Sequence, residues 1–257
     1  MAEHLTVARE GATTTITLSR PEKRNALSHD VMVELRDALR EAGRSDTLAV
    51  VLAAEGPVFS AGHNFADMAG ADLQATRALF ALCCELMETV QAIPQPVIAK
   101  VHALATAAGC QLVATCDLAV AAESAGFALP GGKGGLFCTT PLVAVSRNVS
   151  RKRAFELALT GDPIDAATAA DWGLINHVVP DAELDDAVAD LVARVTRGSA
   201  YGRSMGKAAF YAQVGLDQRQ AYAVALESMA AGAVTADAQE GIAAFLAKRK
   251  PEFTSKP

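Results

Sequence analysis

The chain has 257 residues, of which 51% are hydrophobic and 20% are charged, and its formal net charge is −6 at pH 7. This composition excludes an extended disordered chain, and the length allows one or two domains that need no disulfide or metal to stabilise a core. The acidic balance and the lack of a long basic run argue against nucleic acid as the main partner.

The first residues and the cysteines bear on the expected location. The opening MAEHLTVARE has neither the basic and apolar regions of a signal peptide nor the Arg- and Ser-rich pattern of a transit peptide. No stretch reaches about 18 apolar residues without a charge, so no membrane span is expected. The five cysteines form no CxxC pair and lie in apolar surroundings, which is typical of reduced, buried thiols. We therefore expect a cytoplasmic protein.

The first half of the chain alternates strands and helices. Two alternating runs on either side of Gly11 predict a β-hairpin over residues 5–18, and Ser28 is placed to cap a helix with apolar residues at helical spacing. The next elements are expected in the order strand, helix, strand, helix, strand, over residues 49–53, 73–90, 97–101, 107–115 and 118–121. This order predicts an α/β fold.

Helices dominate from about residue 151. They are expected at residues 151–160, 166–172, 181–197, 201–213, 218–235 and 237–249. One short strand at 175–179 interrupts them. The chain has no phosphate-binding loop, no dinucleotide-binding glycine motif and no HExxH pattern, so nucleotide hydrolysis, hydride transfer and metal-dependent hydrolysis have no support.

Two central segments carry the strongest functional signal, FSAGHNFADM at 59–68 and VHALATAAGCQL at 101–112. Together with LSRPEKRNAL at 18–27, the stretch at 159–179 and the C-terminal residues 240–253, they resemble the crotonase superfamily, also called the enoyl-CoA hydratase/isomerase family. The matches occur in order over nearly the whole chain. The resemblance implies a crotonase-like spiral of ββα turns over 1–195 and a helical C-terminal oligomerisation region over 196–257. It also implies homotrimers or dimers of trimers.

The resemblance implies chemistry on an acyl-CoA thioester, whose enolate is stabilised by two backbone N–H groups. By the resemblance, these are the amides of Ala61 and Ala108. A helix beginning at this second segment turns unpaired N–H groups and a positive dipole end toward the developing charge. The CoA thioester is the substrate, and no tightly bound cofactor or metal is expected.

The chain departs from the hydratase pattern at both acid–base positions. By the resemblance, the two glutamates that hydratases use fall at Gln111 and Gly131. Neither residue titrates, and each acid–base group typically contributes ~10²–10⁴-fold to the rate. Standard hydration of an enoyl thioester is therefore not expected.

His63 is the candidate replacement, because the unperturbed pKa of histidine lies near neutrality. The SAGH stretch is similar to that of methylmalonyl-CoA decarboxylase, a relative that also uses a tyrosine where this chain has Phe137. His63 is either a catalytic or ligand-contacting group or a structural loop histidine, and Phe137 is expected on the wall of the acyl pocket.

The resemblance also implies a set of CoA contacts, with a cation meeting a phosphate. The expected residues are Lys23, Arg24, Ala26, Ala61, His63, Asn64, Phe65 and, from a neighbouring subunit, Lys248. Three functions stay open: an enzyme with non-standard acid–base groups, a catalytically silent acyl-CoA-binding protein, and a slow hydratase or a decarboxylase of malonyl-type thioesters.

Overall fold

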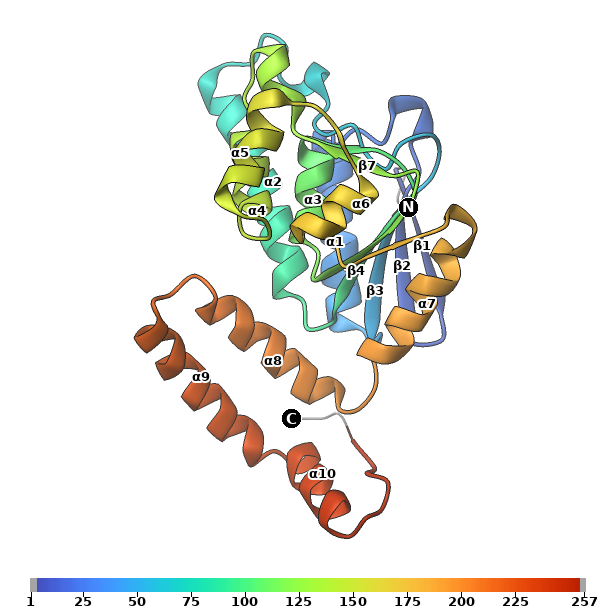
Figure 1. Ribbon diagram of the computed structural model, residues 1–257, viewed down its shortest axis with the longest axis vertical. Coiled ribbons are helices and arrows are strands. Elements are labelled where there is room, and N and C mark those ends of the chain that lie inside the picture. The colour runs from blue at the N-terminus through green and yellow to red at the C-terminus, as the bar shows by residue number, and fades with distance from the viewer. Residues whose placement is uncertain (1–3, 255–257) are drawn as a thin grey trace.

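The computed structural model describes residues 4–254 (Figure 1). Its larger sheet has six strands in the order β1-β2-β3-β4-β6-β9, and its smaller sheet has the order β5-β7-β8. The strands are β1 Leu5–Glu10, β2 Thr13–Leu18, β3 Ala49–Ala54, β4 Val97–Val101, β5 Ala105–Thr106, β6 Leu118–Ala122, β7 Gly126–Ala128, β8 Ile164–Asp165 and β9 His177–Val179. Within the larger sheet β1 pairs antiparallel to β2, and the pairings from β2 to β9 are parallel.

The core helices and short 3₁₀ turns fill the connections between strands. The α-helices are α1 His29–Arg44, α2 Leu73–Ala92, α3 Ala108–Thr115, α4 Thr139–Val145, α5 Arg151–Thr160, α6 Ala166–Trp172 and α7 Leu184–Val195. The 3₁₀ turns are η1 Pro21–Lys23, η2 Phe65–Asp67, η3 Pro130–Gly134 and η4 Asp181–Glu183. The structure confirms the predicted hairpin, in which Leu5 pairs with Leu18 and Gly11 has a φ of 58° at the turn. It adds α4, for which the sequence gives no clear signal.

The larger sheet separates two apolar cores, because successive side chains of a strand point to opposite faces. In β3, Val50 and Leu52 join the main core with α1, α2 and α3. Val51, between them, joins a smaller core on the other face, where α7 contributes Leu184, Val188 and Leu191. The parallel strands are therefore buried on both sides, as their continuous apolar runs indicate.

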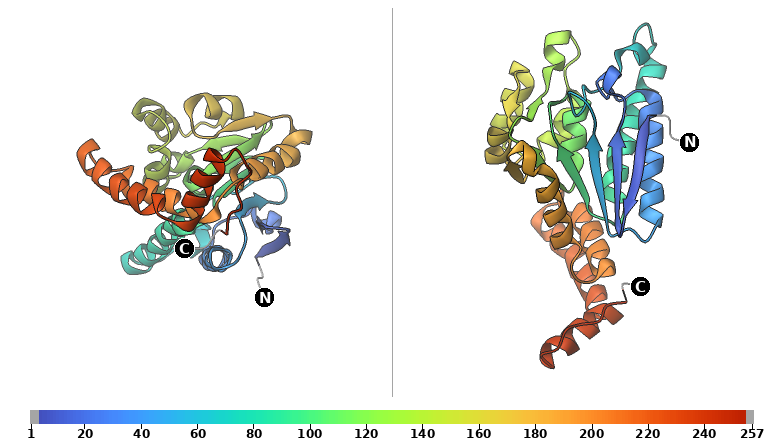
Figure 2. Two further views of the ribbon diagram at one scale, coloured as in Figure 1. Left: turned by 90° about the horizontal axis from the view of Figure 1, so that it is seen from below. Right: turned by 90° about the vertical axis from the view of Figure 1, so that its right-hand side faces the viewer.

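The last three helices extend away from both sheets as an arm, made of α8 Ala200–Gln213, α9 Gln218–Ala233 and α10 Ala236–Leu246 (Figures 1 and 2). Neither α8 nor α9 contains a buried residue, and α10 buries Asp237 and Ala244. The helix predicted over 237–249 ends earlier, because Lys248 takes a left-handed φ of 52° and the Arg249 amide donates to the Ala244 carbonyl at 3.0 Å. This turn closes the helix in the way a C-terminal cap does.

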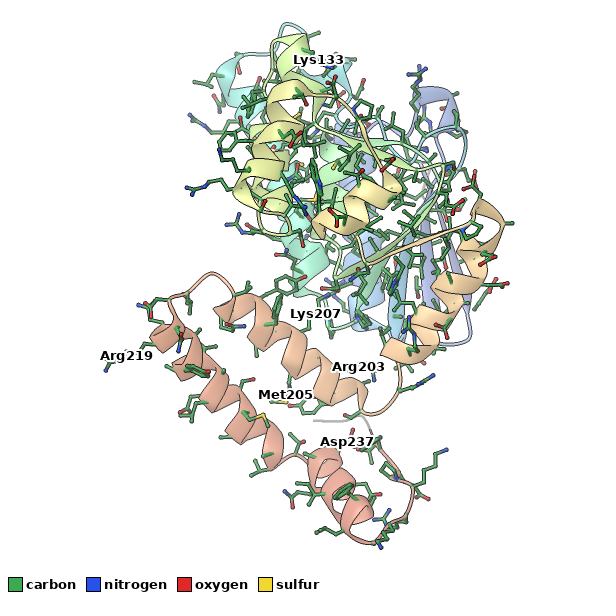
Figure 3. All side chains as sticks on the ribbon, viewed as in Figure 1. Lys133, Arg203, Met205, Lys207, Arg219 and Asp237 are labelled. Atoms are coloured by element: carbon green, nitrogen blue, oxygen red, sulfur yellow. The ribbon has the colours of Figure 1, made fainter. Side chains whose placement is uncertain are left out.

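Lys207 attaches the arm to the core, and Figure 3 shows it on the side of α8 that faces the core. Its ammonium group donates to the Asp117 carboxylate at 2.6 Å and to the carbonyl oxygens of Val90 and Gln95 at 2.9 and 2.8 Å. The Tyr211 hydroxyl donates to the other oxygen of Asp117 at 2.7 Å. Asp117 therefore has a structural role at the junction. Across residues 4–254, no helix is long and apolar enough to span a membrane.

Candidate active site

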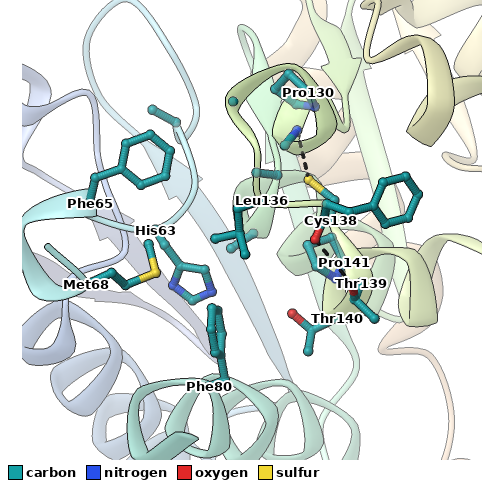
Figure 4. Close-up of a pocket in the computed structure, with 16 residues that line it drawn as sticks. His63, Phe65, Met68, Phe80, Pro130, Leu136, Cys138, Thr139, Thr140 and Pro141 are labelled. Atoms are coloured by element: carbon teal, nitrogen blue, oxygen red, sulfur yellow. Dashed lines mark hydrogen bonds between the residues drawn. The ribbon is translucent and has the colours of Figure 1, made fainter. Parts of the chain in front are cut away.

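A cavity of about 400 Å³ lies between η2, α2, the start of α3 and the segment that runs from η3 into α4 (Figure 4). Its walls are mostly apolar. The lining residues are Ala61, His63, Phe65, Met68, Phe80, Ala107, Ala108, Pro130, Gly131, Gly134, Leu136, Phe137, Cys138, Thr139, Thr140 and Pro141. The two segments singled out in the sequence, 59–68 and 101–112, therefore meet at one cavity. Phe137 also lies on its wall.

Asn25 fixes the first of these segments to the loop that precedes α1. Its backbone takes a left-handed φ of 48°, and its side-chain amide donates to the carbonyl oxygens of Glu55 and Val58 at 2.8 and 3.0 Å. The Ser60 hydroxyl donates to the Asn25 carbonyl at 2.8 Å. Asparagine tolerates this backbone conformation better than most residues, which explains the Asn of the RPxxxN stretch.

The Ala61 amide is already engaged, which corrects the expectation that it contributes to an oxyanion hole. It donates to the carbonyl oxygen of Arg24 at 3.0 Å. Two residues further, His63 pairs in parallel with Leu27, and the bonds of this bridge run from the Leu27 amide to Gly62 and from the Asn64 amide to Leu27. The N–H of His63 takes no part in this pairing, and it has no acceptor within residues 4–254.

The second amide comes from the first residue of α3. Ala107 precedes the helix with a φ of 50°, and its own N–H donates to the Ala128 carbonyl at 2.9 Å. Ala108 begins the helix, so its N–H has no acceptor in the preceding turn, and none is recorded in the described part of the chain.

Gly62 brings the two amides together. A Cβ atom at Gly62 would lie 2.8 Å from the Cβ of Ala107 and 3.1 Å from the nitrogen of Ala108. Only glycine fits this approach, and its φ of 85° is one that other residues rarely adopt. The backbone around Gly62 thus lies against the start of α3, with the amides of His63 and Ala108 on neighbouring stretches of the cavity wall.

The His63 side chain also faces the cavity, beside Phe80 (Figure 4). The two rings meet edge to face, with centroids 5.2 Å apart. Both ring nitrogens are buried, and neither has a hydrogen-bond partner within residues 4–254. Burial lowers the pKa of His63, while the nearby Leu27 backbone and Asp67 carboxylate act in the opposite direction. The imidazole is therefore predominantly neutral at pH 7.

Gln111 does not line the cavity. The residue is only 4% exposed, and its Oε1 atom lies 3.8 Å from the Sγ of Cys83, which is placed to donate to it. Because Cys83 belongs to α2, this contact joins α3 to α2. The Gln111 amide group thus lies in the packing between these helices.

Gly131 does line the cavity, but the surrounding loop packs tightly against it and leaves no space for a side chain. The Leu136 amide donates to the Gly131 carbonyl at 3.0 Å, and the Gly131 amide lies 3.3 Å from the Sγ of Cys138. A Cβ atom at Gly131 would overlap the Leu136 carbonyl oxygen and lie 2.7 Å from the Cys138 sulfur. No side chain fits here without a change in the loop.

The cavity wall holds two titratable side chains among its described residues, His63 and Cys138, and no carboxylate or cation. Burial raises the pKa of the Cys138 thiol, so it stays protonated at neutral pH. Residues 4–254 contain no group of three His, Cys, Asp or Glu side chains arranged to hold a metal ion.

The other expected CoA contacts are only partly brought together. His63 and Phe65 line the cavity, and the Asn64 side chain caps η2 by accepting from the Ala66 amide at 3.2 Å. Lys23 and Arg24, followed by Ala26, form a loop bonded to the first segment. Lys248 follows α10, which lies at the opposite end of the molecule from the cavity (Figure 1). Within one chain, Lys248 therefore does not meet this site.

Sequence reasoning expected the pocket walls within residues 65–90 and 130–140 but did not single out Met68 and Phe80, which line the cavity. Both lie within the segments quoted from the sequence, 59–68 and 73–90. A single apolar residue on a half-buried face nevertheless carries no signal that distinguishes a cavity wall from a core.

Comparison with known proteins gives consistent results. The model of the Enoyl-CoA hydratase/isomerase family matches residues 8–256. Enoyl-CoA hydratase domain-containing protein 3, mitochondrial, of Rattus norvegicus is 44% identical over 241 residues, which cover 93% of this chain and 80% of that protein. The 2,3-dehydroadipyl-CoA hydratase of Escherichia coli is 34% identical over 269 residues, with 98% and 99% covered.

Solved structures agree over nearly the full length. The crystal structure of an enoyl-CoA hydratase from Mycobacterium smegmatis has a TM-score of 0.94 and 45% identity, and the match covers 97% of this chain and 98% of that one. Human enoyl Coenzyme A hydratase domain-containing protein 3 has a TM-score of 0.93 and 40% identity, with 97% and 100% covered.

These relatives also correct the expected location. A cytoplasmic location is contradicted, because the names of the vertebrate relatives place those proteins in mitochondria. Reduced thiols argue against an oxidising compartment but do not distinguish one reducing compartment from another, which is why the inference failed. For the family, in contrast, sequence, fold and structure agree: the chain belongs to the enoyl-CoA hydratase/isomerase family and has the crotonase fold.

Proposed function

We propose that the chain is an enzyme that binds an acyl-CoA thioester and stabilises its enolate with the backbone amides of His63 and Ala108. The observation that carries this proposal is the pair of unengaged N–H groups, held on the wall of one cavity by the contact between Gly62 and the start of α3 within the described residues. Removing one such donor typically costs ~3–4 kcal/mol of transition-state stabilisation. Acyl-CoA is also the chemistry that the relatives' names share.

Standard hydration does not fit this site. Adding water across a double bond needs a base for the water and an acid for the α-carbon. The two expected positions hold Gln111, which packs against α2, and Gly131, which has no room for a side chain. We therefore assign proton transfer to a non-standard group, and His63 is the candidate, because its lowered pKa leaves the imidazole neutral at pH 7 and able to accept a proton.

The test is exchange of the α-protons of butyryl-CoA in D₂O, followed by mass spectrometry. We expect the protein to catalyse the exchange and to leave crotonyl-CoA unhydrated at high enzyme concentration. In Gly62→Ala, the added Cβ atom clashes with the start of α3 and displaces the backbone that aligns the two amides. The exchange of the α-protons should therefore slow by ~10²–10³-fold. Gly70→Ala is the matched control, because Gly70 has a φ of 73° but open space around it.

A protein that binds butyryl-CoA without exchanging its α-protons would overturn the proposed activity. That result would favour the second candidate, a catalytically silent acyl-CoA-binding protein, which the absence of carboxylates among the described lining residues supports. Rapid hydration of crotonyl-CoA would instead establish a hydratase without the usual carboxylates. Loss of CO₂ from a malonyl-type thioester would establish a decarboxylase.

The arm supports a proposal about assembly. Its helices expose large apolar side chains, including Leu226, Met229 and Phe245. We propose that other copies of the chain cover this surface, as a homotrimer or a dimer of trimers. Such an assembly is also the way in which Lys248 of one copy would approach the CoA phosphates in the site of another, while Lys23 and Arg24 contact them from the same chain.

A further inference from the structure

We propose that a cavity at the junction between the arm and the core is a second binding site, which takes a small monocarboxylate with an apolar body and holds the arm against the core. The cavity has a volume of about 350 Å³. Among the described residues, it shares none of its lining with the candidate active site. The inference is therefore independent of the proposed function.

Both parts of the molecule contribute to the walls of this cavity. The core provides residues from the connection between α2 and β4, from the end of α3 and from the end of α7, and the arm provides one face of α8. The lining residues are Pro94, Pro96, Asp117, Val195, Arg203, Gly206, Lys207, Phe210 and Tyr211. A ligand bound here would thus contact the arm and the core at the same time.

The ion pair in the wall has no capacity left for a ligand. An ammonium group has three protons, and the three acceptors of Lys207 are the Asp117 carboxylate and two backbone carbonyls. Asp117 also accepts from the Val97 amide and from the Tyr211 hydroxyl, both at 2.7 Å. The charges of Asp117 and Lys207 cancel, so neither group attracts an ion into the cavity.

Arg203 is the charged side chain of the wall that lacks a counter-ion. Its Nη1 atom donates to the carbonyl oxygens of Arg197 and Gly198 at 2.8 and 3.3 Å, in the connection from α7 to α8. Its Nε atom is buried without a partner, and no carboxylate within residues 4–254 forms an ion pair with it. Burial lowers the pKa of Arg203, but an arginine stays charged at neutral pH. The cavity therefore carries one unmatched positive charge.

The bonds that Arg203 makes leave one edge of its guanidinium group free. Both carbonyls accept from Nη1, so the Nε and Nη2 donors, which lie side by side, have no acceptor in the described part of the chain. Two such donors form parallel hydrogen bonds to the two oxygens of a carboxylate. A buried donor without an acceptor is costly, so a carboxylate that fills this place gains affinity.

The other walls define the body of the ligand. They consist mostly of apolar groups, the rings of Pro94, Pro96, Phe210 and Tyr211 and the side chain of Val195. Burial of an apolar body against them removes apolar surface from water and favours binding. A second anionic group on the ligand would be buried without a cation, which is unfavourable. We therefore expect a short monocarboxylate with an aromatic or branched body.

Binding at this place bears on the attachment of the arm. The ligand would bridge α8 to the connection between α2 and β4, beside the single ion pair that joins the two parts now. A ligand that binds the attached state stabilises that state by mass action. Amide hydrogen exchange over residues 196–211 should therefore slow when the ligand binds.

The experiment titrates benzoate into the full chain by calorimetry, with benzamide as an uncharged ligand of the same shape. Benzoate should bind at least ~10-fold more tightly than benzamide, because the amide lacks the charge. Arg203→Lys keeps a positive charge but loses the two parallel donors, and it should weaken benzoate binding by ~10–100-fold. Arg219→Lys is the matched control, since Arg219 is exposed on α9, outside the cavity lining (Figure 3).

Gly206→Leu gives a second test that leaves Arg203 in place. A Cβ atom at Gly206 would meet no other atom within 4 Å, so the backbone of α8 accepts the substitution, and the longer side chain would occupy the cavity. Leucine also favours a helix more than glycine does. Benzoate binding should be lost, while the thermal stability of the unliganded protein should not fall.

Four results would overturn the inference. The first is no binding of benzoate, and the second is equal binding of benzoate and benzamide. The third is displacement of benzoate by butyryl-CoA, which would place benzoate in the candidate active site. The fourth is binding that is unchanged in both Arg203→Lys and Gly206→Leu. Loss of benzoate binding as the chain self-associates at high concentration would also reject it, because a second copy of the chain would then fill the cavity.

Discussion

The core over residues 4–195 and the arm formed by α8, α9 and α10 use their apolar residues in opposite ways. In the core, strands such as β3 and β4 are buried on both faces. In the arm, Met229 is 77% exposed and Phe245 is 82% exposed. An apolar surface of this kind typically marks an interaction site. The core is therefore stabilised within one chain, whereas the arm is attached to the core through Lys207 and leaves large apolar side chains exposed.

The largest loss of stability is expected from Lys207→Ala, which removes the junction between the arm and the core. The change removes the cation that pairs with the half-buried Asp117 carboxylate, which keeps its hydrogen bonds from the Val97 amide and the Tyr211 hydroxyl. It also leaves two backbone carbonyls without this donor. Removing one partner of a buried ion pair typically costs ~3–5 kcal/mol, so the free energy of unfolding in urea should fall by about that amount. Lys133→Ala is the control, because the Lys133–Asp162 pair is exposed and should be worth less than ~1 kcal/mol. Equal effects of the two substitutions would contradict the role of the junction.

A smaller effect is expected inside the core from Asn25→Ala. The substitution removes the amide that bonds to Glu55 and Val58 and the oxygen that accepts from the Arg20 amide. Unsatisfied buried groups cost ~1–3 kcal/mol, and the left-handed backbone adds strain for alanine. We expect a loss of about 2–3 kcal/mol in urea unfolding, together with slower α-proton exchange, because this loop positions the segment before His63. A variant with lowered stability but unchanged exchange would show that the loop does not align the site.

The smallest effect on the stability of a single chain is expected from Met229→Ser combined with Phe245→Ser. Exposed positions typically change the free energy of unfolding by less than ~0.5 kcal/mol each. Self-association should nevertheless weaken strongly, which sedimentation at several concentrations would measure. Val7→Ser, at an exposed residue of β1, serves as the control. An unchanged assembly would show that the arm is not the interface.

The sequence can predict most of the core elements because their signals are local. The alternation around Gly11 predicts the hairpin, and the apolar runs predict β3, β4 and β6. The sequence does not predict the helix α4, because this helix follows a glycine-rich stretch. It also contains Thr139, Thr140 and Pro141, none of which favours a helix interior. Its formation depends on packing with neighbouring elements.

The candidate site can be predicted only in part, because backbone directions depend on distant partners. Ala61 and His63 are two residues apart, and the sequence cannot show which of their backbone N–H groups donates a hydrogen bond within the chain. That depends on backbone hydrogen bonds with Arg24 and Leu27, which lie far away in the sequence. The same holds for Gln111, which occupies the expected position on α3 but contacts Cys83. Residue types and order can be read from the sequence, while the directions of their polar groups require the structure.

The loop closed around Gly131 has a consequence for how this protein could evolve. A glutamate codon at this position would not by itself place a carboxylate in the cavity, because its first side-chain atom would overlap the Leu136 carbonyl oxygen. Several residues of the loop would have to change together before selection could act on any gain. A carboxylate at this position is thus hard to gain by a single mutation.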